Sequence, residues 1–149
     1  MHPFDIKAAL LAKHAQHVIL IHFPIALFIA GVAFDFLAHW TKQQRLAAAA
    51  YCNFLAAALT TIPVLVTGIL AWQWQLEGQR LKGILLTHLV MGCISSGLIW
   101  AVWLIHRQTQ RRQGGILPGY RLPVEALAVA VVTLTGHLGG FLSGVNGPG

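Results

Sequence analysis

Four long apolar segments constrain the fold of this chain more than any other feature of its sequence. An α-helix needs about 20 apolar residues to cross the roughly 30 Å hydrocarbon core of a membrane. Helices satisfy all of their backbone hydrogen bonds internally, which lipid requires because it offers no partners. The sequence therefore predicts four membrane-spanning helices, over roughly residues 17–40, 46–72, 84–105 and 122–145.

The composition excludes a small water-soluble domain. Of the 149 residues, 56% are hydrophobic and 9% are charged, whereas soluble domains carry about 25% charged residues. Four spans joined by short loops predict an all-α fold, an up-and-down four-helix membrane bundle that forms a single domain over residues 1–149. For residues 1–16 the sequence predicts a short helix on the membrane surface.

The positive charge of the chain indicates topology rather than nucleic-acid binding. The net charge is +6, but the basic residues are few and lie at the ends of the spans. Basic residues are commoner in cytoplasmic loops. The loops opposite the termini hold more of them (Lys42, Arg45, Arg107, Arg111, Arg112 and Arg121) than the terminal side does (Lys7, Lys13, Arg80 and Lys82). We therefore expect a multi-pass protein of the bacterial inner membrane with both termini in the periplasm.

Three of the spans carry a histidine at a similar predicted depth. With a rise of 1.5 Å per residue, His22, His88 and His137 all lie roughly 7 Å below the outer surface. His17 lies one or two turns above them, at the rim. An ionisable side chain within a span is costly to bury, and it is therefore a functional hypothesis by default.

Small residues beside these histidines favour haem. Gly92 follows His88 by one helical turn and Gly140 is close beyond His137, which leaves room for a flat macrocycle. By depth, the best pair of axial ligands for a haem b is His22 with His88. His137 is a third ligand, a partner of a propionate, or a ligand of another haem with His17. Arg80 and Lys82 are on the correct side to meet propionates.

Two alternatives use the same histidines without haem. Imidazole also suits copper, zinc and iron ions, so His22, His88 and His137 are equally the candidate ligands of a bare metal ion. In the other alternative each histidine is neutral and bonded to a neighbouring helix, and the protein is a structural subunit without a cofactor. The sequence contains no nucleophile triad, phosphate-binding loop or metalloprotease motif, which favours an electron-transfer subunit over a stand-alone enzyme.

Other polar residues lie near the predicted cytoplasmic end. Asp35 and Asn53, on adjacent spans, suggest a hydrogen bond between helices or, alternatively, a proton path. For His39 and His106, at the ends of their spans, we expect solvated or interfacial positions.

Several short motifs resemble a known family. They are His17, the HFPIAL segment that begins at His22, Thr67-Gly68, His88 and the TGHLGG segment that begins at Thr135. Together, over roughly residues 14–146, they are similar to the bacterial inner-membrane proteins known as domain of unknown function 2231. Some members of that family are joined to, or encoded near, redox proteins. The resemblance therefore implies electron transfer with membrane or periplasmic redox partners.

Overall fold

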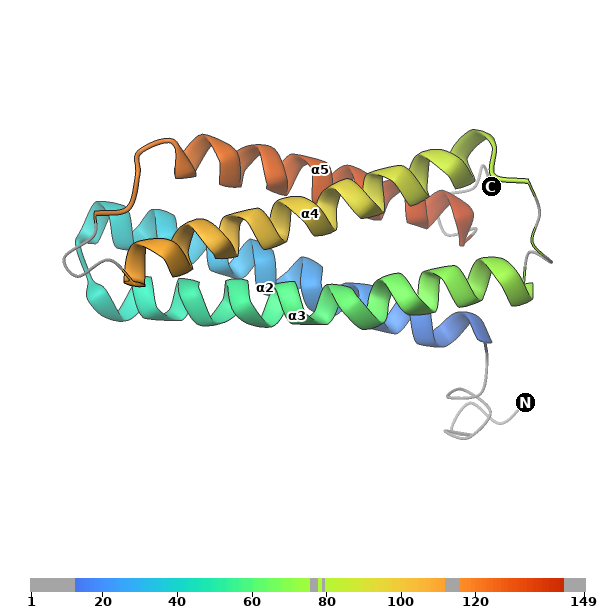
Figure 1. The fold of residues 1–149 in the computed structure, drawn as a ribbon, viewed down its shortest axis with the longest axis horizontal. Helices are drawn as coiled ribbons and strands as arrows, with labels where there is room; N and C mark the ends of the chain where they lie inside the picture. The colour runs from blue at the N-terminus through green and yellow to red at the C-terminus, as the bar shows by residue number, and fades with distance from the viewer. Residues whose placement is uncertain (1–12, 76–77, 79, 112–115, 144–149) are drawn as a thin grey trace.

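Four helices make up the computed structural model, which describes residues 13–75, 78, 80–111 and 116–143. They are α2 (Lys13–Thr41), α3 (Gln44–Gln75), α4 (Gly83–Arg111) and α5 (Arg121–Leu142). Successive helices run in opposite directions along the long axis of the molecule (Figure 1). The predicted all-α bundle is confirmed. Most of the predicted surface helix lies outside the described residues, and residues 13–16 belong to α2.

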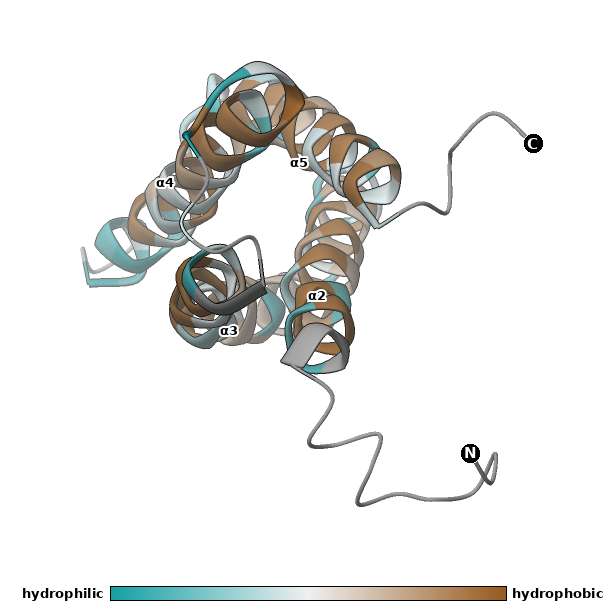
Figure 2. Cartoon of the chain, turned by 90° about the vertical axis from the view of Figure 1, so that its right-hand side faces the viewer, coloured by the Kyte–Doolittle hydropathy of each residue, from teal (hydrophilic) through white to brown (hydrophobic). Residues whose placement is uncertain are grey.

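The surface of the bundle suits lipid. All four helices are long and apolar enough to cross a membrane, and Figure 2 shows hydrophobic residues along each of them. Large apolar side chains are exposed on every helix, for example Phe23, Ile62, Val90 and Leu127. In water this much exposed apolar surface would be unfavourable, whereas lipid covers it. The protein is a four-span membrane protein.

Two helices end later or earlier than the hydropathy of the sequence predicts. Helix α4 continues past residue 105 to Arg111, and α5 ends at Leu142, before residue 145. The apolar pattern marks the part of a helix that lies in lipid, but the backbone can stay helical in the polar residues that follow. As a result His106, which we expected at a solvated span end, lies inside a helix.

The α2–α3 connection is a tight turn. Lys42 has a left-handed backbone (φ 59°), and its N–H donates to the carbonyl of Ala38 at 2.9 Å. This is a common way to end a helix. It allows α3 to turn back directly along α2, and these two helices form the closest packed pair, with α4 and α5 forming the next.

Small residues let α2 and α3 approach closely. Ala50, Ala57 and Ala58 of α3 are fully buried. On α2, a Cβ added at Gly31 would lie 2.8 Å from the Phe54 ring, closer than real Cβ contacts. Small residues of this kind permit close packing between membrane helices.

The buried residues are not spread evenly along the bundle. We call the end where α2 and α4 begin the histidine end, and the opposite end, where α2 and α4 finish, the charged end. The apolar core lies in the middle and towards the charged end; it contains Phe28, Phe54, Ile99, Val102 and Val132. At the histidine end, every side chain in residues 16–23, 62–73, 83–94 and 133–142 is half-buried or exposed. Within these described ranges, no buried side chain therefore closes this end of the bundle.

Candidate functional site

His88 is held by the helix that packs beside it. Its Nδ1 lies 3.1 Å from the carbonyl oxygen of Thr135 on α5. A carbonyl can only accept a hydrogen bond, so we infer that Nδ1 carries a hydrogen and donates. In the neutral ring the lone pair then lies on Nε2. A bond of this kind fixes both the tautomer and the direction of a metal-binding histidine.

His17 is held in a similar way on the other helix pair. Its Nδ1 lies 3.1 Å from the hydroxyl oxygen of Thr67 on α3. That hydroxyl has one hydrogen, and it lies 2.8 Å from the carbonyl of Pro63 and 3.1 Å from that of Val64. Because the hydrogen goes to one of these carbonyls, the oxygen accepts from His17 Nδ1. His17 therefore also presents the lone pair of Nε2.

A glycine lies against each of the two rings. A Cβ added at Gly68 would be 3.0 Å from Cε1 of His17, and one at Gly139 would be 3.1 Å from Cε1 of His88. Each of the two hairpins, α2–α3 and α4–α5, thus holds one of these two rings together with a threonine partner and a glycine that makes room for the ring.

His17 and His88 thus have matching surroundings in the two hairpins, at the same end of the bundle. We call them the histidine pair. The sequence placed His17 at the rim and chose His22 as the partner of His88. Of these two residues of α2, His17 has a hydrogen bond to another helix, as His88 does. The choice of His22 as the partner stays a prediction.

His22 and His137 lie in different surroundings. Both side chains are exposed. Nδ1 of His22 bonds to the carbonyl of Val18 on its own helix at 2.6 Å. The His137 ring packs edge-on against Phe141 of its own helix, with 5.0 Å between ring centroids. A ligand role for either residue stays a prediction.

The glycines that were predicted to give clearance have open or half-buried positions. Nothing lies within 4 Å of a Cβ added at Gly92, one turn after His88. Gly140 is half-buried, and its carbonyl accepts a hydrogen bond from the Ser143 hydroxyl at 3.0 Å. Arg80 and Lys82 are exposed at the same end. A side chain at Gly92 would therefore meet no described neighbour at its Cβ.

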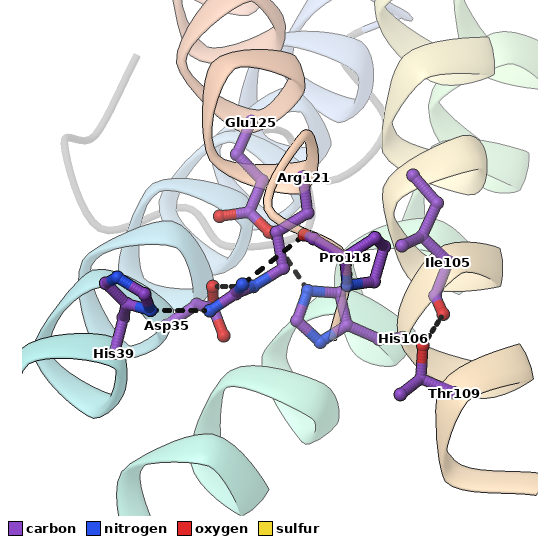
Figure 3. Close-up of polar contacts among 8 residues, drawn as sticks. All are labelled: Asp35, His39, Ile105, His106, Thr109, Pro118, Arg121 and Glu125. Carbon is purple, nitrogen blue, oxygen red and sulfur yellow. Dashed lines mark hydrogen bonds and ion pairs between the residues drawn. The ribbon is translucent and has the colours of Figure 1, made fainter. Parts of the chain in front are cut away.

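A second polar group lies at the charged end and was largely missed by the sequence analysis. Figure 3 shows Asp35, His106, Arg121 and Glu125 pointing towards one another from α2, α4 and α5. Their exposed fractions are 1%, 3%, 5% and 0%. We call these four residues the charged cluster.

Two ion pairs connect the helices of the charged cluster. Arg121 Nε donates to Asp35 Oδ2 at 2.8 Å, and His106 Nε2 lies 2.9 Å from Glu125 Oε1. The ring of Phe54 on α3 packs against His106 with 4.8 Å between centroids. All four helices therefore contribute to the cluster or its cover.

The cluster changes two expectations. His106 is buried and paired, so the solvated position predicted for it is wrong, because α4 extends further than expected. Asp35 does bond to another helix, but its partner is Arg121, whereas the Asn53 amide donates to the Ala49 carbonyl of its own helix at 2.9 Å. Arg121 is consequently a buried partner and not a free loop cation that sets topology.

Sequence signals for the cluster did exist. Glu125 is an acid within an apolar span, which is unusual enough to suggest a function. It follows Arg121 by four residues, as His39 follows Asp35, and residues four apart share a helix face. The sequence does not show that the helix face with Asp35 and the helix face with Arg121 and Glu125 lie against each other.

Comparison with known proteins finds one family. The family model described as "Predicted membrane protein (DUF2231)" matches residues 13–147. No curated protein and no solved structure matches the chain.

Proposed function

Because the chain belongs to the DUF2231 family of predicted membrane proteins, its place of action is a membrane, and we propose that it acts there as a b-type haem protein in electron transfer. The observation that carries the proposal is the histidine pair. Each ring is fixed through Nδ1 and has its Nε2 lone pair available, and the two rings come from different hairpins.

The residues present fit a haem. Two neutral imidazoles are a usual set of axial ligands. His88 has open space beside Gly92, and the half-buried surroundings of both rings would restrict water without excluding a large planar group. When bound, a haem supplies reversible one-electron chemistry between ferrous and ferric iron.

The chain's own residues would tune that chemistry. Thr67 and the Thr135 carbonyl accept the Nδ1 hydrogens of the pair, which raises the basicity of each imidazole. The weakly packed histidine end also leaves surface for a redox partner, in the membrane or in the periplasm, and the protein would serve as a subunit of a larger assembly. The basic residues in the loops favour an inner-membrane protein with both termini in the periplasm.

An absorption spectrum of the purified full-length protein tests the proposal. We expect a Soret band that shifts on reduction. The band should be lost in His17→Ala and in His88→Ala, and retained in His39→Ala, which removes a histidine at the opposite end. A band lost in His22→Ala and retained in His17→Ala would replace His17 by His22 as the ligand.

Two other outcomes would reject haem. A colourless protein that holds about one copper, zinc or iron ion per chain, lost in His88→Ala, would favour the non-haem site. A colourless protein without metal would favour a structural subunit.

The role of Thr67 can be tested separately. Thr67→Val keeps the side-chain shape but cannot accept the His17 hydrogen bond. We expect the band to persist and the reduction potential to rise, because a less basic ligand stabilises ferric iron less. An unchanged potential would mean that Thr67 does not act on the iron through His17.

A further inference from the structure

The charged cluster at the opposite end has no role in the proposed electron transfer, and its charges do not balance. Arg121 carries one positive charge and pairs with Asp35 at 2.8 Å. Glu125 carries a second negative charge and is fully buried. If His106 is neutral, the four side chains together hold one uncompensated negative charge.

Among the residues that the structure describes, the neighbouring groups do not supply the missing positive charge. Nη2 of Arg121 lies 3.5 Å from Nδ1 of His39, and because a guanidinium can only donate, Nδ1 of His39 accepts and carries no proton. The guanidinium of Arg107 lies over the Trp103 ring, 5.0 Å from its centroid. From α3, the group against His106 is the apolar ring of Phe54.

Two carboxylate oxygens of the cluster also lack hydrogen-bond donors. Oδ1 of Asp35 and Oε2 of Glu125 are buried, and neither has a hydrogen-bond partner among the described residues. Buried polar atoms nearly always have a partner. These two are both acceptors, so the cluster lacks hydrogen donors as well as positive charge.

The geometry points to one bound proton. We propose that the charged cluster is a proton-binding site, in which a single proton is shared between Nε2 of His106 and Oε1 of Glu125. Their separation of 2.9 Å is a hydrogen-bond distance. With that proton, two positive charges balance two negative charges, and none is left unpaired in a low-dielectric interior.

A metal ion is the competing occupant. Ligand atoms of Asp35, His106 and Glu125 lie within 4.8 Å of one another, which a metal ion could draw together. However, the fixed charge of Arg121, in contact with Asp35, would repel a divalent cation. A proton adds one charge, which is the amount the cluster lacks.

The site lies away from the histidine pair and does not depend on it. His39, which is half-buried, connects the cluster to the exposed last turn of α2 and so marks the side from which a proton would enter. A membrane protein with a proton site at one end can exchange a proton with the solution on that side.

Nuclear magnetic resonance and infrared spectra of the full-length protein in lipid nanodiscs test the proposal. With ¹⁵N-labelled histidine, we expect an imidazolium signal from His106 at neutral pH. If the proton rests on Glu125 instead, we expect the infrared band of a protonated carboxylic acid. Either signal should be lost in Glu125→Gln, because Asp35 and Arg121 then balance each other. The signal of His106 is identified by its loss in His106→Gln.

A charge-matched variant provides the control. Asp35→Asn combined with Arg121→Gln removes one charge of each sign, so the proton should be retained. A neutral His106 beside an ionised Glu125 in the unmodified protein would overturn the proposal, and that measurement needs no variant to fold. Tightly bound metal at one equivalent per chain, lost in Asp35→Asn, would overturn it in favour of a metal site.

Discussion

At the charged end of the bundle, polar side chains from three helices are almost completely buried and form two ion pairs with one another. At the histidine end, the polar side chains are half-buried or exposed, His17 and His88 each bond to the neighbouring helix, and no side chain in the ranges described there is buried. The first arrangement is difficult to change without leaving a charge unpaired. The second is easy to change, and it leaves room for a ligand or a partner.

This difference suggests that the two ends of the bundle have different roles. Removing one partner of a buried ion pair is expensive, about 3–5 kcal/mol, because the other charge stays behind. Hydrogen bonds between membrane helices contribute much less, about 0.6 kcal/mol on average. The charged end should therefore hold the fold together, while the histidine end supplies binding surface. Three substitutions, taken from the largest expected effect to the smallest, test that view.

The largest effect is expected for Arg121→Gln. It leaves Asp35 buried without a cation and should lower the free energy of unfolding by about 3–5 kcal/mol. Chemical denaturation in detergent measures the loss. The control, Arg107→Gln, removes an arginine that only stacks on Trp103 and should cost about 0.5–1 kcal/mol. Equal losses of unfolding free energy for the two variants would show that the ion pair of Arg121 stabilises the protein no more than the contact of Arg107 with Trp103.

A smaller effect is expected for Gly31→Ala. The new methyl group would lie 2.8 Å from the Phe54 ring, which is fully buried. Overfilling a packed core costs about 1–3 kcal/mol, measured as above. Gly92→Ala, towards the histidine end, meets nothing within 4 Å and should cause no loss from crowding. If Gly92→Ala destabilised as much as Gly31→Ala, the two ends would be packed alike.

The smallest effect is expected for Ser95→Ala. The Ser95 hydroxyl lies 2.8 Å from Oγ1 of Thr135 and so joins α4 to α5. Its loss should cost about 0.6 kcal/mol, because Thr135 keeps its bond to the Val131 carbonyl. The neighbouring Ser96 bonds only to the Gly92 carbonyl of its own helix. Ser96→Ala should therefore have a smaller effect, and the reverse order would argue against an inter-helix role for Ser95.

The sequence predicted the four spans well because length and hydropathy determine whether a helix can cross lipid. Its choice of His88 as a ligand stays a prediction. It placed His17 at the rim of the first span, and the candidate span of the structure begins at Gln16. The partner of His17 is a threonine fifty residues away in the sequence, and residue spacing along one helix carries no information about such a contact.

The charged cluster escaped prediction for a related reason. His106 and Arg121 border a polar loop, and on their own they are ordinary residues for the end of a span. Their meaning depends on which way the ends of α2, α4 and α5 face. Only the packing of the helices brings Asp35, Arg121 and Glu125 together, and that packing is set by contacts between distant parts of the chain.

The division of the bundle into two hairpins has a consequence for biogenesis. His17 and Asp35 belong to the first hairpin, whereas His88, His106, Arg121 and Glu125 belong to the second. Neither half contains a whole histidine pair or a whole charged cluster. Both groups of residues are complete only when the two hairpins pack together. Binding of a cofactor at the histidine pair and binding of a proton at the charged cluster would therefore each indicate that the bundle has finished assembling in the membrane.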